Sequence, residues 1–194
     1  MAPVTVYYIK ASKQFWGRST SIVLTLDHAG VEFEIKDKSE APEGVGFTVP
    51  IITLESGQHL SQTLAILNAL GDKYGLNGKT VEEKNVCLQT KLDLNDMLVE
   101  IKPGILKENP ERLEKWLSVF EARLQGTYFG GDSVSTADFL GKFVFTLINF
   151  KFGEDYQEKF PNLKKWNAAI NEVPAVKKMN ESGVDIMPVF MKKK

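Results

Sequence analysis

The spacing of hydrophobic residues along the chain changes near residues 75–80. Before this point, short apolar runs that are rich in β-branched and aromatic residues, or that alternate with polar residues, predict β-strands. Stretches with apolar residues at helical spacing lie between these runs and predict two helices. The expected strands span residues 4–9, 31–35 and 49–54, with a short hairpin partner at 59–60, and the expected helices span 19–29 and 62–74.

The rest of the chain has the pattern of helices alone. Apolar residues recur there every three or four positions, and prolines such as Pro110 and Pro174 stand where helices begin or end. The expected helices span residues 80–102, 110–124, 135–150 and 161–173. This order predicts an α/β domain over residues 1–78, followed by an all-α domain over residues 79–194.

Composition and charge limit the classes of partner. The 194 residues carry a formal net charge of -1, with 43% hydrophobic and 25% charged residues, which is enough for a core but gives no basic excess. Because nucleic-acid binding requires a positively charged surface, we expect no nucleic-acid partner. The sequence shows neither a run of apolar residues long enough to span a membrane nor a signal-peptide pattern, which predicts a soluble, cytoplasmic protein without a membrane partner.

Residues that form disulfides or bind metals are few. Cys87 is the only cysteine, so the chain has no internal disulfide and no CxxC motif for thiol redox chemistry. We expect Cys87 to be a core residue of the helix over 80–102. His28 and His59 show no ligand spacing, and we expect no metal site.

Val49-Pro50 is the first motif that points to a ligand. A proline has no N–H to donate within a sheet, so it belongs at a sheet edge. A cis peptide here would turn the edge outward, and the main-chain groups of Val49 could then pair with an extended peptide ligand. An ordinary trans proline at the start of a strand is the alternative reading of the same two residues.

Gln62-Thr63 is the second motif, at the expected start of the helix over 62–74. The N-terminus of a helix presents free N–H groups and a partial positive charge, and therefore attracts carboxylates. Gln62 adds an amide and Thr63 adds a hydroxyl. The alternative is helix capping alone, by Ser61 or by Thr63.

Together these motifs resemble a known family. The segment VPIITLESGQHLSQTLAILNAL, residues 49–70, is similar to the glutathione-binding segment of the glutathione S-transferase superfamily, where a cis-proline strand, a hairpin and a Gln-Ser helix start bind glutathione. In GGDSVSTADF, Ser135 and Asp138 resemble the N-capping box of the family. The similarity also covers GLNGKT at 75–80 and FPNLKKWNAAINEVPAVKKM at 160–179, and it is closest in its details to the sigma-like, tyrosine-type branch. It implies a thioredoxin-like first domain.

The resemblance also implies a catalytic residue. In the tyrosine-type branch, a tyrosine at the end of the first strand hydrogen-bonds the glutathione sulfur and stabilises its thiolate. Tyr8 matches this position best, and Tyr7 points to the opposite face because side chains alternate along a strand. The loop that follows is longer than in this branch, and it places Ser12 where serine-type transferases have their activating hydroxyl. Ser12 is therefore the rival candidate.

One part of the expected site departs from the family. Relatives have a helix between the second strand and the Val-Pro strand, and this helix carries a Trp or Lys that binds the glycine carboxylate of glutathione. Here only DKSEAPEGVGFT fills the span, and it is short and poor in helix formers. Lys38 is the candidate for the carboxylate contact, with Lys36 as a second choice and a solvated surface charge as the alternative for both.

The resemblance implies a glutathione transferase that conjugates or isomerises hydrophobic electrophiles. Glutathione is then the co-substrate, with no metal, and Tyr8, Lys38, Val49, Pro50, Gln62 and Thr63 are the expected binding residues. The helical domain is expected to supply an electrophile pocket, from residues 101–106 and 189–191. Family members are usually homodimers, so we expect a homodimer with a role in detoxification. The alternative is a non-catalytic binding or structural protein on the same fold.

Overall fold

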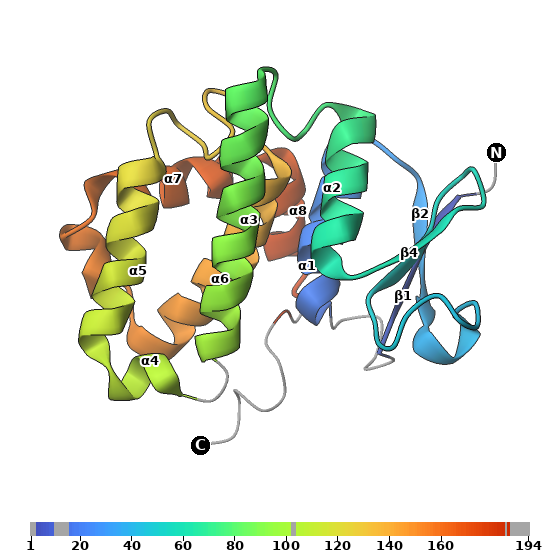
Figure 1. The fold of residues 1–194 in the computed structure, drawn as a ribbon, viewed down its shortest axis with the longest axis horizontal. Coiled ribbons are helices and arrows are strands. Elements are labelled where there is room, and N and C mark those ends of the chain that lie inside the picture. Colours follow the sequence, from blue (N-terminus) through green and yellow to red (C-terminus); the bar gives the residue numbers. More distant parts are fainter. Residues whose placement is uncertain (1–2, 10–15, 102–103, 185, 187–194) are drawn as a thin grey trace. The chain divides into compact units, whose positions relative to one another are not determined.

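The computed structural model describes residues 3–9, 16–101, 104–184 and 186. The chain divides into two compact units, residues 1–74 together with 174–194, and residues 75–173. The first unit contains a four-stranded sheet with helices, whereas the named elements of the second unit are helices (Figure 1). The predicted α/β-plus-helical architecture is thereby confirmed. The domain limits of 1–78 and 79–194 stay a prediction, and the compact grouping differs from them chiefly in residues 174–194.

The sheet of the first unit has the order β2-β1-β3-β4. Strand β1 (Val4–Tyr8) pairs in parallel with β2 (Phe33–Asp37) and antiparallel with β3 (Ile51–Thr53). Strand β3 also pairs antiparallel with β4 (His59–Ser61). As a result, the carboxyl ends of β1, β2 and β4 and the amino end of β3 lie along one edge of the sheet.

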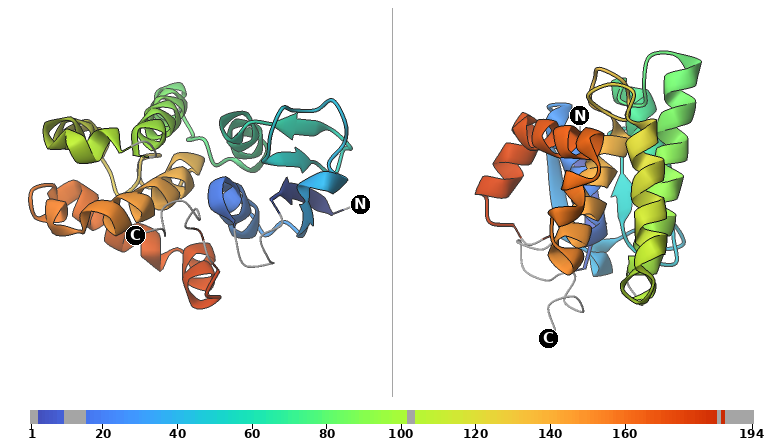
Figure 2. Two further views of the ribbon diagram at one scale, coloured as in Figure 1. Left: turned by 90° about the horizontal axis from the view of Figure 1, so that it is seen from below. Right: turned by 90° about the vertical axis from the view of Figure 1, so that its left-hand side faces the viewer.

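Among its described residues, the first unit also has three α-helices: α1 (Thr20–His28), α2 (Thr63–Tyr74) and α8 (Pro174–Glu181). A short 3-10 helix, η1 (Gly17–Ser19), leads into α1. Helix α1 contacts both α2 and α8 (Figure 2). The core of this unit consists of fully buried aliphatic side chains from the central strands and from α1 and α2, namely Val4, Val6, Ile22, Leu26, Ile52, Ile66, Leu67 and Leu70.

The segment between β2 and β3 contains one short helical turn, η2 (Lys38–Glu40). The Asp37 side chain accepts a hydrogen bond from Ser39 N–H at 3.0 Å, which fixes the start of that turn. The loop that follows runs against β4, because Ser61 Oγ donates to the Val45 carbonyl at 3.1 Å and a Cβ on Gly46 would lie 2.5 Å from Ser61 Cβ. Gly46 is therefore required for this close approach.

The second unit contains α3 (Val81–Ile101), α4 (Ile105–Glu108), α5 (Pro110–Arg123), α6 (Thr136–Phe152), the 3-10 helix η3 (Asp155–Glu158) and α7 (Pro161–Glu172). Helices α3 and α6 pack along each other. The aromatic rings of Phe120, Phe129, Phe145 and Trp166 form a buried cluster with neighbouring ring centroids 5.1 to 6.1 Å apart. Such offset and edge-on pairs strengthen a core beyond the area that they bury.

Asp138 ties the start of α6 to this aromatic cluster. Its buried carboxylate accepts hydrogen bonds from Ser135 N–H at 2.8 Å, Ser135 Oγ at 2.6 Å, Phe129 N–H at 2.9 Å and Trp166 Nε1 at 2.8 Å. Burial raises the pKa of Asp138, while these four donors lower it. The capping role predicted for Ser135 and Asp138 is confirmed.

The hydrophobic pattern was wrong on the start of one strand, and it did not predict α8. The second strand begins at Phe33 rather than residue 31, because Val31 N–H still donates to the Leu26 carbonyl at the end of α1. Pro174 does end α7, but it also opens α8, where its missing N–H costs nothing. Leu88 and Leu92 face solvent, whereas the Leu94, Leu98 and Ile101 of the same helix are buried.

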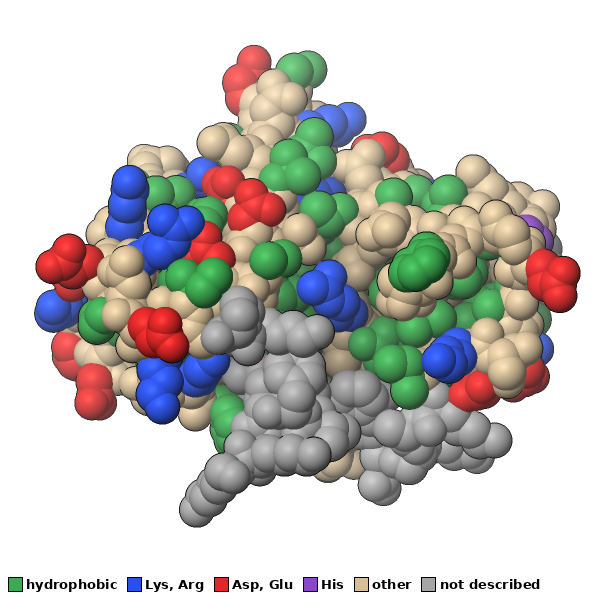
Figure 3. Space-filling view, turned by 60° about the horizontal axis from the view of Figure 1, so that its bottom comes forward, with side chains coloured by type: hydrophobic (Ala, Val, Ile, Leu, Met, Phe, Trp, Pro, Cys, Tyr) green, Lys and Arg blue, Asp and Glu red, His purple; other side chains and the backbone are tan. Residues whose placement is uncertain are grey.

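The surface carries charges of both signs. On the face drawn in Figure 3, Lys and Arg side chains are interspersed with Asp and Glu, which agrees with the formal net charge of -1. Within the described ranges, no helix is both long enough and apolar enough to cross a membrane.

Candidate functional site

The sheet register brings the predicted site residues of the first unit to one edge. Tyr8 ends β1 opposite Asp37, so Lys38 follows at the same level of the sheet. Ile51 begins β3 and pairs with Tyr7 of β1 and with Ser61 of β4. Val49-Pro50 directly precedes Ile51, and Gln62 directly follows Ser61. Residues far apart in sequence therefore meet along the edge where β1, β2 and β4 end.

Tyr7 and Tyr8 lie on opposite faces of the sheet, as strand alternation predicts. The phenol oxygen of Tyr8 accepts a hydrogen bond from the backbone N–H of Arg18 in η1, at 2.9 Å. Tyr7 lies on the face of its register partner Lys36, together with Thr5, whose hydroxyl donates to Glu34 at 3.0 Å. Both rings are buried, with 8% and 7% of their surface exposed.

Tyr8 keeps its proton at neutral pH. Burial raises the pKa of its phenol above the ordinary value, and the Arg18 N–H bond and the Arg18 charge lower it by less. A protonated phenol has one O–H to donate and an oxygen that accepts. The group can therefore stabilise an anion as a hydrogen-bond donor, but it is not a base at neutral pH.

The Val49-Pro50 peptide is cis. Pro50 is buried and Val49 is half-buried, directly before β3. Strand β3 pairs with its neighbouring strands only from Ile51 onward, where Ile51 is the partner of Tyr7 and Ser61. The backbone of Val49 thus extends beyond the paired part of the sheet.

Gln62 has an unusual backbone. Its φ is +71°, and it is the one non-glycine residue of the described chain with a positive φ. Residues other than glycine and asparagine seldom adopt a positive φ. Those that do tend to mark functional sites. The Gln62 carbonyl accepts the first helical hydrogen bond of α2, from Ile66 N–H at 3.0 Å, and its side chain is exposed.

Thr63 is the first residue of α2 and is 9% exposed. The N–H groups of the first helical turn have no acceptor within the helix, and they point along the axis away from it. Because β4 leads into α2 through Ser61 and Gln62, this N-terminus lies at the same edge as Tyr8. An anionic group bound there would meet the positive end of the helix dipole.

Lys38 begins η2, directly after the last residue of β2. Its side chain is exposed and forms no ion pair with another residue in the described part of the chain. Lys36, the second choice, instead forms an ion pair with Glu34 at 2.7 Å on the face of the sheet that carries Tyr7. The geometry thus leaves Lys38 available at the edge and engages Lys36 elsewhere.

Other predicted residues fall outside the described ranges. Ser12 and residues 189–191 belong to these parts of the chain.

In the second unit, Ile101 and Leu106 are buried, while Ile105 and Phe150 are exposed. The Lys151 ammonium of α6 donates to the Ile101 carbonyl at 2.6 Å and so caps the C-terminal end of α3.

Arg18 is not among the site residues expected from the sequence, yet its backbone contacts Tyr8. Gly17 has a positive φ of +44°, and the chain turns there into η1. That turn directs the Arg18 N–H to the Tyr8 oxygen. A glycine shortly before an amphipathic helix was the available signal.

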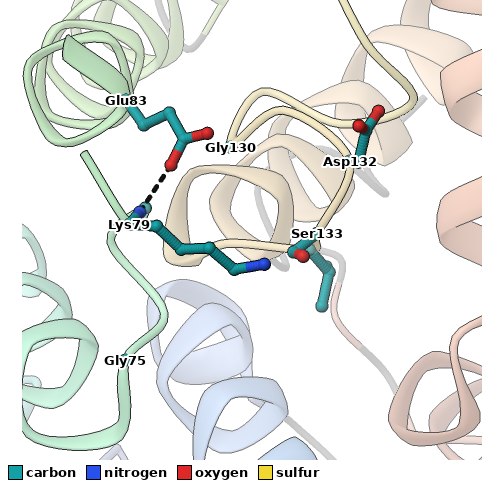
Figure 4. Close-up of a pocket in the computed structure, with 8 residues that line it drawn as sticks. Gly75, Lys79, Glu83, Gly130, Asp132 and Ser133 are labelled. Carbon is teal, nitrogen blue, oxygen red and sulfur yellow. Dashed lines mark hydrogen bonds between the residues drawn. The ribbon is translucent and has the colours of Figure 1, made fainter.

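A small pocket of about 100 Å³ lies in the second unit, where the GLNGKT segment enters α3. Glu83 caps that helix start by accepting from the N–H groups of Lys79 at 2.5 Å and Thr80 at 3.1 Å. The Lys79 side chain extends across the pocket toward Ser133 (Figure 4). Gly78 has a φ of +101° and no room for a Cβ beside Glu83, which explains its place in the segment.

Among the described residues, no group of three or more His, Cys, Asp and Glu side chains is arranged to hold a metal ion. Cys87 is fully buried, as expected for a core residue. Its thiol lies 3.9 Å from Asn77 Oδ1, which also accepts from the buried Lys91 ammonium at 3.0 Å.

Comparisons with known proteins agree with this architecture. Residues 100–174 match the family model described as Glutathione S-transferase, C-terminal domain. The chain is 33% identical over 156 residues to Glutathione S-transferase Mu 1 of Oryctolagus cuniculus, covering 72% of this chain and 69% of the relative. It is 30% identical over 190 residues to Glutathione S-transferase alpha-1 of Rattus norvegicus, covering 86% of this chain and 85% of the relative.

Solved structures support the fold. The crystal structure of the glutathione S-transferase from Ascaris lumbricoides superimposes with a TM-score of 0.77 at 24% identity, covering 95% of this chain and 98% of the other. The sequence relatives span both units, and the fold agrees over nearly the whole length. The chain therefore belongs to the glutathione S-transferase superfamily.

Proposed function

We propose that this protein is a glutathione transferase of the sigma-like, tyrosine-type branch, which conjugates or isomerises hydrophobic electrophiles with glutathione thiolate. One observation carries the proposal: the register of the sheet assembles Tyr8, Val49-Pro50 and Gln62-Thr63 at a single edge. The relatives named glutathione S-transferases support the same chemistry for this chain.

Val49 and Gln62 would hold the peptide backbone of glutathione. The main chain of Val49, beyond the paired part of β3, is suited to antiparallel pairing with the cysteinyl residue. The γ-glutamyl carboxylate would bind at the N-terminus of α2, with Thr63 Oγ1 and the Gln62 amide as additional partners. The positive φ of Gln62 supports a functional role for this backbone, because strained residues tend to cluster at binding and catalytic sites.

Tyr8 would donate its O–H to the glutathione sulfur. A hydrogen bond to the thiolate favours the charged form and lowers the pKa of the thiol, whose proton passes to solvent. The thiolate sulfur then uses its electron pair to form a bond to an electrophilic carbon. In a substitution, the leaving group departs with the electrons of the broken bond. The raised pKa of Tyr8 suits this donor role.

Lys38 would bind the glycine carboxylate of glutathione. It follows β2 at the level of Tyr8 and is exposed. A single exposed ammonium contributes little, since surface ion pairs are worth about 0–1 kcal/mol. We therefore expect Lys38 to adjust affinity for glutathione rather than to determine it.

The second candidate function is a non-catalytic binding or structural protein on the same fold. It is favoured by the segment between β2 and β3, which has only the η2 turn where the family resemblance implies a helix for the glycine end. The two candidates differ in one property: a transferase needs a thiolate-stabilising group, whereas a binding protein does not.

We further propose a homodimer, a cytoplasmic location and a role in detoxification, as the resemblance implies. A stripe of apolar side chains on α3 supports the dimer, because Val81, Leu88, Leu92 and Val99 recur at helical spacing and are all exposed. Phe47 in the loop before β3 is fully exposed as well.

Calorimetric titration with glutathione and conjugation of a chlorinated nitrobenzene test the proposal. Tyr8→Phe is expected to lower turnover by about two orders of magnitude, the usual cost of a lost donor to a developing anion. Tyr7→Phe is the matched control and should retain activity, because its ring lies on the other face of the sheet. If Ser12→Ala removes turnover and Tyr8→Phe does not, the catalytic assignment is wrong. Absence of binding at millimolar glutathione would refute both binding and catalysis.

A further inference from the structure

An apolar pocket of about 150 Å³ lies in the first unit, away from the residues assigned above. It is formed where α1 and α8 lie side by side (Figure 1). Its lining consists of Trp16, Val23, Leu24, Phe33, Ala175 and Met179, together with Asp27, Lys178 and Ser182.

The Phe33 side of the pocket lies at the opposite end of the central strands from Tyr8. Phe33, in its lining, pairs with Val4 at the beginning of β1. Tyr8 pairs with Asp37 at the other end of the same two strands. Because each strand residue advances by about 3.3 Å, these two ends are roughly 13 Å apart. A ring packed against Phe33 would therefore lie at the other strand end from Tyr8, whereas Trp16 of the same lining precedes by two residues the Arg18 that contacts Tyr8.

The size and lining of the pocket suit a single aromatic ring. An apolar cavity of about 150 Å³ is known to take up benzene. Trp16 and Phe33 offer ring faces and edges, for which offset contacts with a third ring are favourable. The Met179 thioether adds a polarisable contact of the kind that sulfur makes with aromatic rings.

A charged pair marks the polar part of the lining. Lys178 and Asp27 form an ion pair between α8 and α1, with side chains 74% and 22% exposed respectively. A ligand with a full charge would face a like charge in one member of this pair. A hydroxyl group instead donates to the Asp27 carboxylate and accepts from the Lys178 ammonium, and it brings no charge to desolvate.

We propose that this pocket binds a small neutral phenol, with the ring among Trp16, Phe33 and Met179 and the hydroxyl between Asp27 and Lys178. The site is independent of the proposed glutathione site and does not require the protein to be a transferase. Its ligand is distinct from an electrophilic substrate, because a simple phenol has no carbon that a thiolate attacks.

Nuclear magnetic resonance of isotope-labelled methionine methyl groups tests the proposal directly. Titration with p-cresol should shift the Met179 methyl signal to saturation, while the signal of Met97, buried in the second unit, stays unchanged. Toluene, which lacks the hydroxyl, should bind roughly tenfold more weakly, the effect of one hydrogen bond to a charged group. Asp27→Asn should remove most of that preference and leave toluene binding unaffected.

Two variants that fill the pocket complete the test. Ala175→Phe and Ser182→Phe each place a ring in the lining and should abolish the shift of Met179. A thermal unfolding transition of the whole chain like that of the wild type shows that a variant is folded. If Ala175→Phe does not fold, the exposed Ser182 position decides.

The proposal is overturned if Met179 does not respond, if Met97 responds equally, or if p-cresol and toluene bind alike. It is also overturned if the folded variants bind p-cresol as well as the wild type does. Displacement of p-cresol by glutathione would place the ligand at the Tyr8 edge and refute this site, while leaving the proposed transferase function intact. Failure to bind glutathione would have the opposite effect.

Discussion

The backbone N–H of Arg18 donates a hydrogen bond to the phenol oxygen of Tyr8 at 2.9 Å. This contact connects the end of β1 to η1, the turn that leads into α1. It occupies a lone pair of the oxygen, so a backbone group helps to orient the phenol. The donor proposed for the glutathione sulfur is thus held in place by two rigid elements.

Titration of Tyr8 should make the protein less stable in alkali. Burial raises the pKa of Tyr8 in the folded state, and the pKa of Tyr156 is raised as well, chiefly by burial. Above about pH 10 the unfolded chain loses these protons first, so the free energy of unfolding falls as pH rises. Below that pH the two groups contribute no pH dependence.

Urea unfolding on either side of about pH 10 measures this effect. Tyr8→Phe and Tyr156→Phe should each reduce the alkaline loss of stability relative to the wild type. An unchanged pH profile in both variants would show that these phenols do not titrate differently in the folded and unfolded states.

The backbone of Gln62 provides a second prediction. Gln62→Ala and Gln62→Gly both remove the amide, but only glycine adopts a φ of +71° without strain. We expect the glycine variant to be more stable than the alanine variant by about 1 kcal/mol. Chemical denaturation measures the difference, and equal stabilities would contradict the strain. Both variants should bind glutathione more weakly than the wild type.

Asp138 should be essential for the second unit. Asp138→Ala leaves the N–H groups of Ser135, Phe129 and Trp166 buried without their acceptor. We expect the free energy of unfolding to fall by about 3 kcal/mol or more, at roughly 1–3 kcal/mol for each unsatisfied group. Asp132→Ala, in the exposed loop before α6, is the control and should change stability little.

Gly78 and Gly75 form a matched pair within the segment that enters α3. Both have positive φ, but a Cβ at Gly75 would meet nothing within 4 Å, whereas one at Gly78 would lie 2.6 Å from Glu83 Cβ. Gly75→Ala should cost about 1 kcal/mol for its backbone conformation. Gly78→Ala should cost about 2 kcal/mol more, because of the clash. Thermal unfolding separates the two, and equal losses would exclude the clash.

The apolar stripe on α3 predicts the interface of a homodimer. Leu92→Glu places a charge among Val81, Leu88 and Val99 and should yield a monomer in light scattering coupled to size exclusion. Val119→Glu changes an exposed apolar residue of α5 and should leave the mass unchanged. A wild-type monomer would refute the dimer itself.

The hydrophobic pattern predicted most of the fold because burial in this chain follows regular periods. Val4 and Val6 in β1, and Leu94, Leu98 and Ile101 in α3, are buried where their spacing indicates. The pattern missed α8 because a proline that ends one helix can also start another. Helical spacing identifies an apolar face but not what covers that face, and Leu88 and Leu92 of α3 are exposed.

The candidate site was predictable in its residue types but not in its geometry. Val49-Pro50 and Gln62-Thr63 were found from turn and helix-start chemistry, and the sheet register brings them to the edge where Tyr8 lies. The positive φ of Gln62 gave no signal, because glycine is the residue expected in that region. The contact between Arg18 and Tyr8 involves a backbone N–H, which every residue except proline carries, so no residue type in the sequence signals it.

The grouping of α8 with the first unit affects the order in which the protein can fold during synthesis. All of residues 75–173 are made before Pro174 appears, so the helical unit is complete while the sheet unit still lacks a helix. Since domains fold as units during synthesis, the second unit can finish first. The partner of α1, including the Lys178 that pairs with Asp27, arrives only with the last part of the chain. A chain that stops before residue 174 therefore has all four strands of the sheet but lacks the helix that packs on α1.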